Sequence, residues 1–315
     1  MSEVPTSDFA MNSKLASEKT HSCATLQLDN QSVRLGVTER KEFRFDHVLG
    51  PSASQKEVYD TTGVAQSIAS VLEGYHATLF AYGQTGSGKT YTMEGFEYEV
   101  LLNEGVMTTL EASSYKCLKL RWAAESEFFV EDLSLVDSAT GQEMLVKFTE
   151  GVKQKIMAST NMNAASSRSH CIYTIYVESI DLENPALVTT TKLCLEAIGI
   201  NKSLFVLRQV IQILSDEANN APNAAKPHVP YRDSKLTSLL KHSLGGNSIT
   251  VMVVCLSPSD LCYEENLSTL QYAARAQQIS NTPVKNAGEA HKVLVQQLRD
   301  TIRSLQSQLT EVFDS

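Results

Sequence analysis

The chain has 315 residues, 42% of them hydrophobic and 20% charged, so it can build one large domain or two small ones around a real core. Its net charge of −9 argues against generic binding to nucleic acids, and an acidic polymer would have to be met by a local basic patch. No apolar signal core opens the chain and no later run is long enough to span a membrane, which predicts a soluble intracellular protein.

The first quarter of the chain predicts a tail, then short strands, then a helix. Residues 1–23 are polar and rich in serine and threonine, which predicts a disordered tail. Hydrophobic residues then alternate with polar ones, and this pattern predicts strands at 25–28, 32–35 and 41–49. Across residues 55–72 the apolar positions approximate helical spacing.

The most informative stretch is a glycine loop that follows a short apolar segment at 77–82, which predicts a buried strand. The loop reads Gly-Gln-Thr-Gly-Ser-Gly-Lys-Thr and fits the phosphate-loop pattern, with a possible helix start after it. Glycines let backbone N–H groups face phosphate oxygens, while Lys89 would reach the β- and γ-phosphates and the Thr90 hydroxyl would hold Mg²⁺. The alternative is a glycine turn that binds nothing. The candidate phosphate-binding residues are Gly83, Gln84, Thr85, Gly86, Ser87, Gly88, Lys89 and Thr90.

The rest of the chain alternates predicted helices with predicted strands. This order favours an α/β domain in which helices flank both sides of a central, mostly parallel sheet. The run at 249–256 is almost continuously apolar, which is typical of a central strand covered on both faces. Further strands are predicted at 117–122, 128–133, 171–177 and 188–195, and helices at 106–115, 138–156, 201–214, 234–244 and 264–279.

Two segments close the chain. Residues 281–288 contain proline and glycine and predict a linker. From residue 289 onward, hydrophobic side chains repeat every three or four positions, which predicts a C-terminal helix that begins a coiled coil and could form a homodimer. A surface helix packed on its own domain is the alternative, because three heptads are marginal alone.

Several stretches together resemble the kinesin motor domain family, from about residue 28 to residue 286. The glycine loop with its flanks (Phe-Ala-Tyr before it, Tyr-Thr-Met after it) is much more specific than the bare pattern. Asn-Ala-Ala-Ser-Ser-Arg-Ser-His at 163–170 matches the first switch of the family. The remaining matches are the relay-helix start at 200–204, the microtubule-facing loop and helix at 228–247, and the last core helix at 267–276.

The resemblance implies a P-loop NTPase with ATP and Mg²⁺ as cofactors. Tyr91 would lie against the adenine, and the first switch would close on the γ-phosphate when ATP is bound. It implies Lys89, Ser167 and Arg168 as catalytic residues, and Thr90 with Ser167 as the Mg²⁺ ligands. Residues 24–280 would then form the motor domain, 281–288 the neck linker and 289–315 the start of the stalk.

The resemblance also implies a partner, the microtubule, and therefore a place on the cytoskeleton in the cytoplasm. Residues 226–242 hold four basic side chains against one acid, the local patch that an acidic filament requires, although a solvated helix face would look the same. Ser238 stands where the family usually has an arginine, which should weaken the patch. The candidate microtubule-facing residues are Lys202, His228, Tyr231, Arg232, Lys235 and Lys241.

Two parts of the family pattern are missing and a third is shortened, so the predicted motor domain is incomplete. Nothing before Leu26 resembles the first core strand, and the strand after the first phosphate-loop helix is shortened. The second switch is absent, because Leu195 is followed at once by Glu196 and the approach to the relay helix. Glu196 is an unsuitable replacement, since it aligns with the segment before that helix.

These departures keep two functions open. One is a microtubule-based, ATP-driven motor, as the family implies. The other is a binding module that holds nucleotide or microtubules without turnover, because hydrolysis without the second switch should stay near background. The clean junctions between intact motifs also favour skipped segments over gradual drift, and sheet edges left uncovered would put the stability of the fold at risk.

Overall fold

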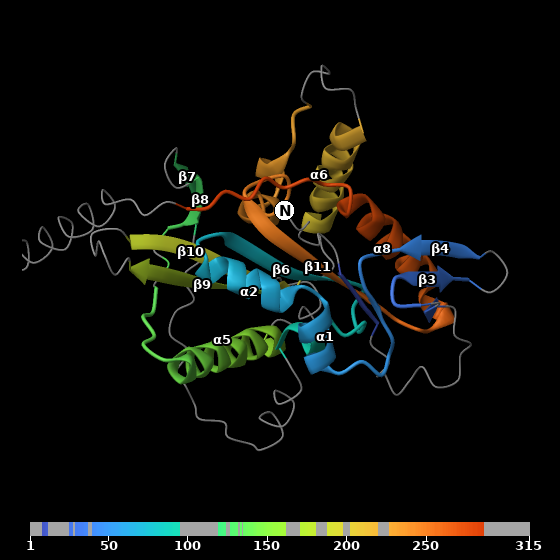
Figure 1. The fold of residues 1–315 in the computed structure, drawn as a ribbon, viewed down its shortest axis with the longest axis horizontal. Coiled ribbons are helices and arrows are strands. Elements are labelled where there is room, and N and C mark those ends of the chain that lie inside the picture. Colours follow the sequence, from blue (N-terminus) through green and yellow to red (C-terminus); the bar gives the residue numbers. More distant parts are fainter. Residues whose placement is uncertain are drawn as a thin grey trace, which may run out of the picture.

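A six-stranded sheet with helices on both faces forms the centre of the computed structural model (Figure 1). The structure describes residues 8–11, 25–27, 29–36, 40–94, 119–123, 127–131, 133, 135–161, 171–180, 188–197, 202–219 and 227–286. The strand order is β5-β1-β11-β6-β10-β9, and every neighbouring pair is parallel except β10 with β9. The strands are β1 (Asp8–Met11), β5 (Val48–Leu49), β6 (His76–Gly83), β9 (Cys171–Ile180), β10 (Val188–Ala197) and β11 (Ser248–Leu256). The expected mostly parallel α/β sheet is confirmed.

The position of β1 corrects the expectation that no core strand precedes Leu26. β1 lies inside the stretch expected to be a disordered tail, and it pairs in parallel with β11 from Asp8 opposite Val253 onward. On its other side it pairs with β5. A four-residue strand between polar neighbours carries little periodic signal, and this one is defined by pairing with residues distant in sequence.

The two central strands, β6 and β11, position the glycine loop. They run parallel and in register from Ser248 opposite His76 to Cys255 opposite Gly83. All of β11 is buried, and β6 is buried beyond its first residue. Both strands are therefore fixed by packing on two faces, and the loop begins at the carboxyl edge of the sheet, where open α/β sheets bind their ligands.

Helices cover the two faces of the sheet with separate hydrophobic clusters. One cluster joins Phe80 and Met252 of the sheet to α6, α7 and α8, and includes Leu207 of α6. The other joins Leu79 and Val251 to α1, α2 and α3. The helices are α1 (Gln55–Thr61), α2 (Val64–Leu72), α3 (Lys89–Glu94), α5 (Gly141–Asn161), α6 (Lys202–Asn219), α7 (Lys235–Leu239) and α8 (Tyr263–Ala276).

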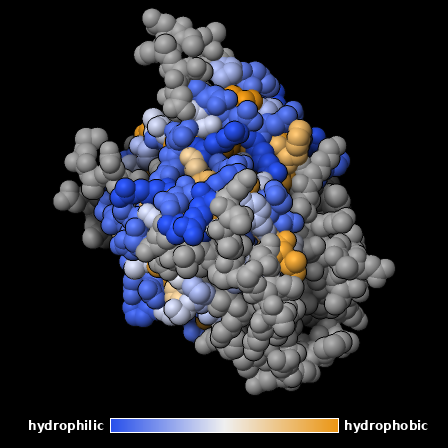
Figure 2. Space-filling view, turned by 90° about the vertical axis from the view of Figure 1, so that its right-hand side faces the viewer, coloured by the Kyte–Doolittle hydropathy of each residue, from blue (hydrophilic) through white to orange (hydrophobic). Residues whose placement is uncertain are grey.

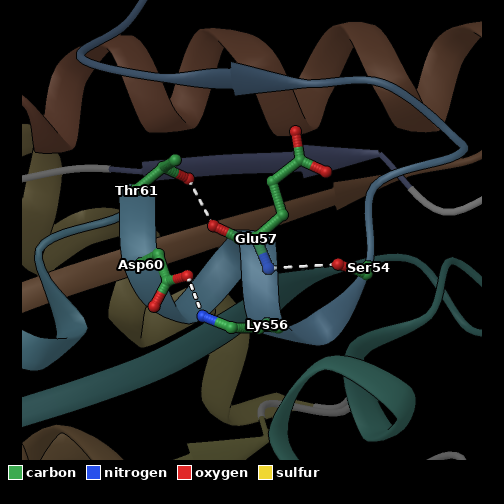
Figure 3. Close-up of polar contacts among 5 residues, drawn as sticks. All are labelled: Ser54, Lys56, Glu57, Asp60 and Thr61. Carbon is green, nitrogen blue, oxygen red and sulfur yellow. Dashed lines mark hydrogen bonds and ion pairs between the residues drawn. The ribbon is translucent and has the colours of Figure 1, made fainter.

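The single helix expected over 55–72 is in fact two helices, because Gly63 takes a left-handed φ of 67° between α1 and α2. Figure 3 shows how α1 begins: the Glu57 backbone N–H donates to the Ser54 hydroxyl at 3.2 Å. Farther along, the Thr61 hydroxyl donates to the Glu57 carbonyl, and Lys56 pairs with Asp60. The side-chain cap satisfies one of the backbone donors that every helix start leaves unpaired.

Two smaller sheets flank the centre. In the first, β3 pairs antiparallel with β2 and β4. Its Val33 and Leu35 are buried in the hydrophobic cluster that also contains residues of α6, α7 and α8. The second is an antiparallel hairpin whose strands pair from Leu120 opposite Val130. The strands are β2 (Thr25–Gln27), β3 (Ser32–Leu35), β4 (Lys41–Arg44), and, in the hairpin, β7 (Leu120–Ala123) and β8 (Glu127–Val130).

Two helices differ from their sequence expectations in detail. The helix expected over 138–156 is α5 at Gly141–Asn161, in which Leu145 is 55% exposed and Val152 is buried. The helix expected over 234–244 ends at Leu239, and its start is preceded by a 3₁₀ helix, η3 (Tyr231–Asp233). The helix expected at 106–115 and the coiled coil expected from residue 289 lie outside the described residues.

On the face drawn in Figure 2, hydrophilic residues dominate the coloured atoms and hydrophobic ones form small separate spots. Among the helices that the structure describes, none combines the length and the hydrophobicity needed to cross a bilayer.

Candidate functional site

The glycine loop joins β6 to α3 at residues 83–88, and its backbone explains the glycines. Gly83, Gly86 and Gly88 have φ values of 153°, 83° and 101°, which residues with a side chain rarely adopt. A Cβ on Gly83 would lie 2.1 Å from the Cys255 carbonyl oxygen. The loop can therefore pass close to β11 only because that position lacks a side chain.

Lys89 is folded over the loop rather than extended into solvent. Its ammonium group donates to the Gly83 carbonyl at 3.0 Å and to the Gln84 carbonyl at 2.5 Å. Burial lowers the pKa of Lys89 below its ordinary value, and the neighbouring Cys255 acts weakly in the opposite direction. A cation held by two neutral carbonyls is poised to take a stronger, anionic partner.

Three further residues, one in the loop and two in the helix that follows it, differ in accessibility. Ser87 is buried, and its hydroxyl donates to the Gln84 carbonyl at 2.9 Å, which closes the loop on itself. Thr90 and Tyr91 are exposed on the first turn of α3, so the Thr90 hydroxyl could ligate a metal ion and the Tyr91 ring could stack on a base. The Gln55 side chain ties α1 to the loop helix by donating to the Tyr91 carbonyl.

The first switch lies outside the described residues. α5 ends at Asn161 and β9 begins at Cys171, and Ser167 and Arg168 fall between them. Their roles therefore stay predictions from the resemblance.

The connection from β10 to α6 is short. β10 ends at Ala197 and α6 begins at Lys202, so only residues 198–201 link the strand to the helix. Glu196 is paired within the sheet with Phe80 of β6 and Ile172 of β9, and is 1% exposed. Neither of its carboxylate oxygens has a hydrogen-bond partner among the described residues, and burial raises its pKa to about 8.

The candidate filament-facing residues are mostly accessible. His228, Arg232 and Lys235 are exposed, Tyr231 and Lys241 are half-buried, and Lys202 is the first residue of α6. The Tyr231 hydroxyl donates to the Leu244 carbonyl at 2.6 Å, which gives this side chain a structural role.

One contact on this surface was missed from the sequence. The Arg232 guanidinium lies 5.2 Å from the centre of the Trp122 ring, so the β7–β8 hairpin meets η3. The signal available in the sequence was the single tryptophan of the chain next to a basic residue, Arg121. Nothing in that local pattern specifies contact with residues more than a hundred positions away.

The linker is bound to the core as far as the structure describes it. The Asn281 side-chain amide donates to the Ser243 and Ser248 carbonyls at 2.9 and 2.7 Å, and its oxygen accepts from the Gly245 backbone at 2.8 Å. Farther along, the Asn286 backbone N–H donates to the Gly74 carbonyl at 2.9 Å. The segment thus follows the amino ends of β11 and β6.

Comparison with known families gives one consistent result. The kinesin motor domain model matches residues 7–110, 97–195 and 186–279, which together cover most of the chain. The match begins just before β1, in agreement with the position of that strand in the sheet. The second and third stretches overlap at residues 186–195, which include most of β10. This overlap is close to the junction at which the sequence analysis expects the second switch to be missing.

Named relatives agree with this assignment. The chain is 34% identical over 343 residues to chromosome-associated kinesin KIF4 of Xenopus laevis, covering 90% of this chain and 27% of the relative. It is 32% identical over 314 residues to kinesin-like protein KIF12 of Mus musculus, covering 79% of this chain and 48% of the relative. The chain therefore spans less than half the length of these relatives.

A solved structure resembles the fold. It is described as the structure of a fast kinesin with implications for ATPase mechanism and interactions with microtubules. The TM-score is 0.76 at 26% identity, with 90% of this chain and 94% of that chain covered. Together with the family match and the glycine-loop geometry, this shows that the chain belongs to the kinesin motor domain family.

Proposed function

We propose that this chain binds ATP with Mg²⁺ at residues 83–91, binds microtubules through the surface around η3 and α7, and hydrolyses ATP slowly or not at all. The observation that carries the proposal is the β10–α6 connection, which leaves only residues 198–201 where the family places its second switch. An ordered glycine loop favours nucleotide binding, whereas the missing switch argues against efficient turnover.

The proposed nucleotide roles follow from the loop geometry. Backbone N–H groups of the loop receive the phosphates, and Lys89 exchanges its two carbonyl partners for phosphate oxygens. Thr90 with Ser167 ligates Mg²⁺, which when bound neutralises charge on the phosphate oxygens. The exposed Tyr91 ring lies against the adenine, and Ser167 with Arg168 contacts the γ-phosphate.

Slow hydrolysis follows from how this chemistry is catalysed. Phosphoryl transfer depends on groups that position the attacking water and stabilise developing charge. Loss of one such group typically lowers the rate by about a hundredfold or more. Glu196 does not replace the missing carboxylate in this proposal, because the residue is buried at 1% exposure.

A microtubule-stimulated motor is the second candidate. The resemblance to a fast kinesin, a protein whose description refers to ATPase mechanism and microtubule interaction, favours it. In either case the proposed place of action is the cytoplasmic microtubule array. Dimerisation through residues 289–315 remains part of the proposal, and sedimentation with and without that segment tests it.

Three measurements on the 315-residue chain test the proposal. Binding of a fluorescent ATP analogue should be detectable and should weaken about tenfold or more in Lys89→Ala, because a charge-assisted contact is lost. Microtubules should sediment the chain in both nucleotide states. Basal and microtubule-stimulated phosphate release should not exceed release by Lys89→Ala.

The matched control is Lys56→Ala, which removes an exposed lysine of α1 whose ammonium group pairs with Asp60 rather than with the loop. It should leave nucleotide affinity unchanged. Turnover that microtubules stimulate well above the Lys89→Ala level would reject the slow-hydrolysis proposal and favour the motor. Failure to bind the ATP analogue would reject nucleotide binding itself.

A further inference from the structure

The β7–β8 hairpin and the η3–α7 segment line an open hollow with a volume of about 360 Å³. Three hydrophobic side chains of the hairpin line it: Leu120, Trp122 and Phe128. Trp122 is 51% exposed, and because the Arg232 guanidinium lies over the ring at 5.2 Å from its centre, only the uncovered part of the ring is open to a ligand. This volume lies at the lower end of the range of about 300 to 1,000 Å³ that small-ligand pockets occupy.

Cationic side chains surround these hydrophobic residues. Arg121, Arg232 and Lys235 line the hollow, and none of its lining residues is acidic. Arg121 is already paired with Glu131 at 3.0 Å, but no carboxylate among the described residues forms an ion pair with Arg232 or Lys235. Among the described residues, the hollow is therefore lined by hydrophobic and cationic side chains, and two of its three cations have no ion-pair partner.

Ser238 makes room for the hollow. It lines the hollow but is buried, and its hydroxyl donates to the Tyr231 carbonyl at 2.8 Å and to the Ser234 carbonyl at 2.9 Å. A short side chain turned back onto its own backbone leaves space and adds no charge. The arginine that the family resemblance leads us to expect here would fill this space with a long cationic chain.

We propose that this hollow binds a hydrophobic side chain carried on an acidic peptide segment, as part of the microtubule contact. The inference rests on the filament binding proposed above and specifies the chemistry of one contact. The hydrophobic side chain would pack on the Trp122 ring, and carboxylates on either side of it would pair with Arg232 and Lys235. An aromatic anchor inside a polar rim is the arrangement that commonly dominates binding between proteins.

Trp122 provides a direct probe, because it is the only tryptophan in the chain. The experiment titrates the full chain with the peptide Glu-Glu-Leu-Glu-Glu and records the tryptophan emission. Saturable quenching or a blue shift is expected, because the leucine would displace water from the indole ring. Neither Glu-Glu-Ser-Glu-Glu nor Gln-Gln-Leu-Gln-Gln should reproduce this signal at the same concentrations.

Two variants with intact Trp122 locate the peptide. Ser238→Arg should abolish the emission change by filling the hollow, and Arg232→Gln should weaken peptide binding about fivefold to tenfold by removing one rim charge. Since Arg232 is exposed, that second variant tests the site even if the buried Ser238→Arg substitution prevents folding. Equal signals from all three peptides, or unchanged binding by Arg232→Gln, would overturn the proposal.

Sedimentation with microtubules separates this inference from the proposed function. If the surface acts by charge alone, Ser238→Arg adds a positive charge and should tighten microtubule binding. Under our proposal, the Ser238→Arg side chain fills the hollow and should weaken microtubule binding about tenfold, because one buried hydrophobic contact is lost. If the wild-type chain never sediments with microtubules, the proposed microtubule binding is wrong. If Ser238→Arg binds microtubules more tightly, only the proposed role of the hollow is wrong.

Discussion

Glu196 lies opposite Phe80 in the parallel pairing of β10 and β6, which places an ionisable carboxyl group inside the sheet beside the strand that leads into the glycine loop. The residue is 1% exposed and its oxygens have no partner among the described residues. Burial raises its pKa from 4.5 to about 8, so the folded chain keeps this group protonated at neutral pH.

This relationship predicts how stability changes with pH. The unfolded chain loses the Glu196 proton above pH 4.5, whereas the folded chain holds it up to about pH 8. Between these values the contribution of Glu196 to the free energy of unfolding should fall with rising pH by about 1.4 kcal/mol per pH unit. Glu196→Gln cannot ionise, so its gain over the wild type should grow from pH 5 to pH 8, as measured by urea unfolding at several pH values.

The matched control for this prediction is Glu178→Gln on the neighbouring strand β9, where the side chain is exposed. It should follow the wild-type pH dependence. A constant difference between Glu196→Gln and the wild type at all pH values would contradict a protonated, buried carboxyl group.

A second prediction concerns the linker. Asn281→Ala removes hydrogen bonds to two backbone carbonyls and one backbone N–H, and should lower the free energy of unfolding by about 2 kcal/mol. The substitution should loosen the linker more than it destabilises the whole domain, because the linker is bound to the core mainly at its two ends. Hydrogen exchange at Thr282, whose N–H donates to the Gly246 carbonyl, should become faster, whereas Ser280→Ala at an exposed neighbour should leave it unchanged.

Thiol reactivity provides a third prediction. Cys255 is completely buried, and burial raises its pKa to about 11, while burial raises that of Cys194 to about 12. Reaction needs an accessible thiolate. Cys255 is buried, and Cys194, although partly exposed like Cys262, has a raised pKa, so neither should be alkylated in the folded chain and Cys262 should react first of these three. Peptide mapping by mass spectrometry after brief iodoacetamide treatment checks the order. Early modification of Cys255 would indicate that the sheet opens next to the loop.

Sequence periodicity was sufficient for the central strands and the helices that pack on them. The apolar run at 249–256 is buried as expected, and the helix predicted over 201–214 is found as α6, which buries Leu207 and Ile211. Hydrophobic spacing predicts such elements because the same side chains are stabilised by burial. The glycine loop was located from residue types alone, because only glycine fits φ values such as those of Gly86 and Gly88.

Features defined by distant contacts could not be predicted in this way. β1 is four residues long and becomes a strand by pairing with β11 and β5, which its own sequence does not specify. The break at Gly63 was missed because the hydrophobic spacing continues through it. The contact of Trp122 with Arg232 and the burial of Glu196 likewise depend on tertiary arrangement.

The last prediction tests the geometry of the loop itself. Gly83 has a φ of 153°, and a Cβ there would lie 2.1 Å from the Cys255 carbonyl and 2.8 Å from the Ser87 hydroxyl. The carbonyl belongs to the central strand β11 and cannot move without disturbing the sheet. Gly83→Ala should therefore lower the free energy of unfolding by about 2 kcal/mol or more and weaken binding of the fluorescent ATP analogue.

The matched substitution is Gly151→Ala in α5, where an added Cβ meets no atom within 4 Å. Because alanine favours helix over glycine, this variant should gain about 0.5 to 1 kcal/mol and keep the wild-type affinity for the analogue. Urea unfolding and analogue titration on both variants give the comparison. Equal stability of the two variants would mean that β6 and β11 do not approach each other at Gly83 as closely as the structure has them.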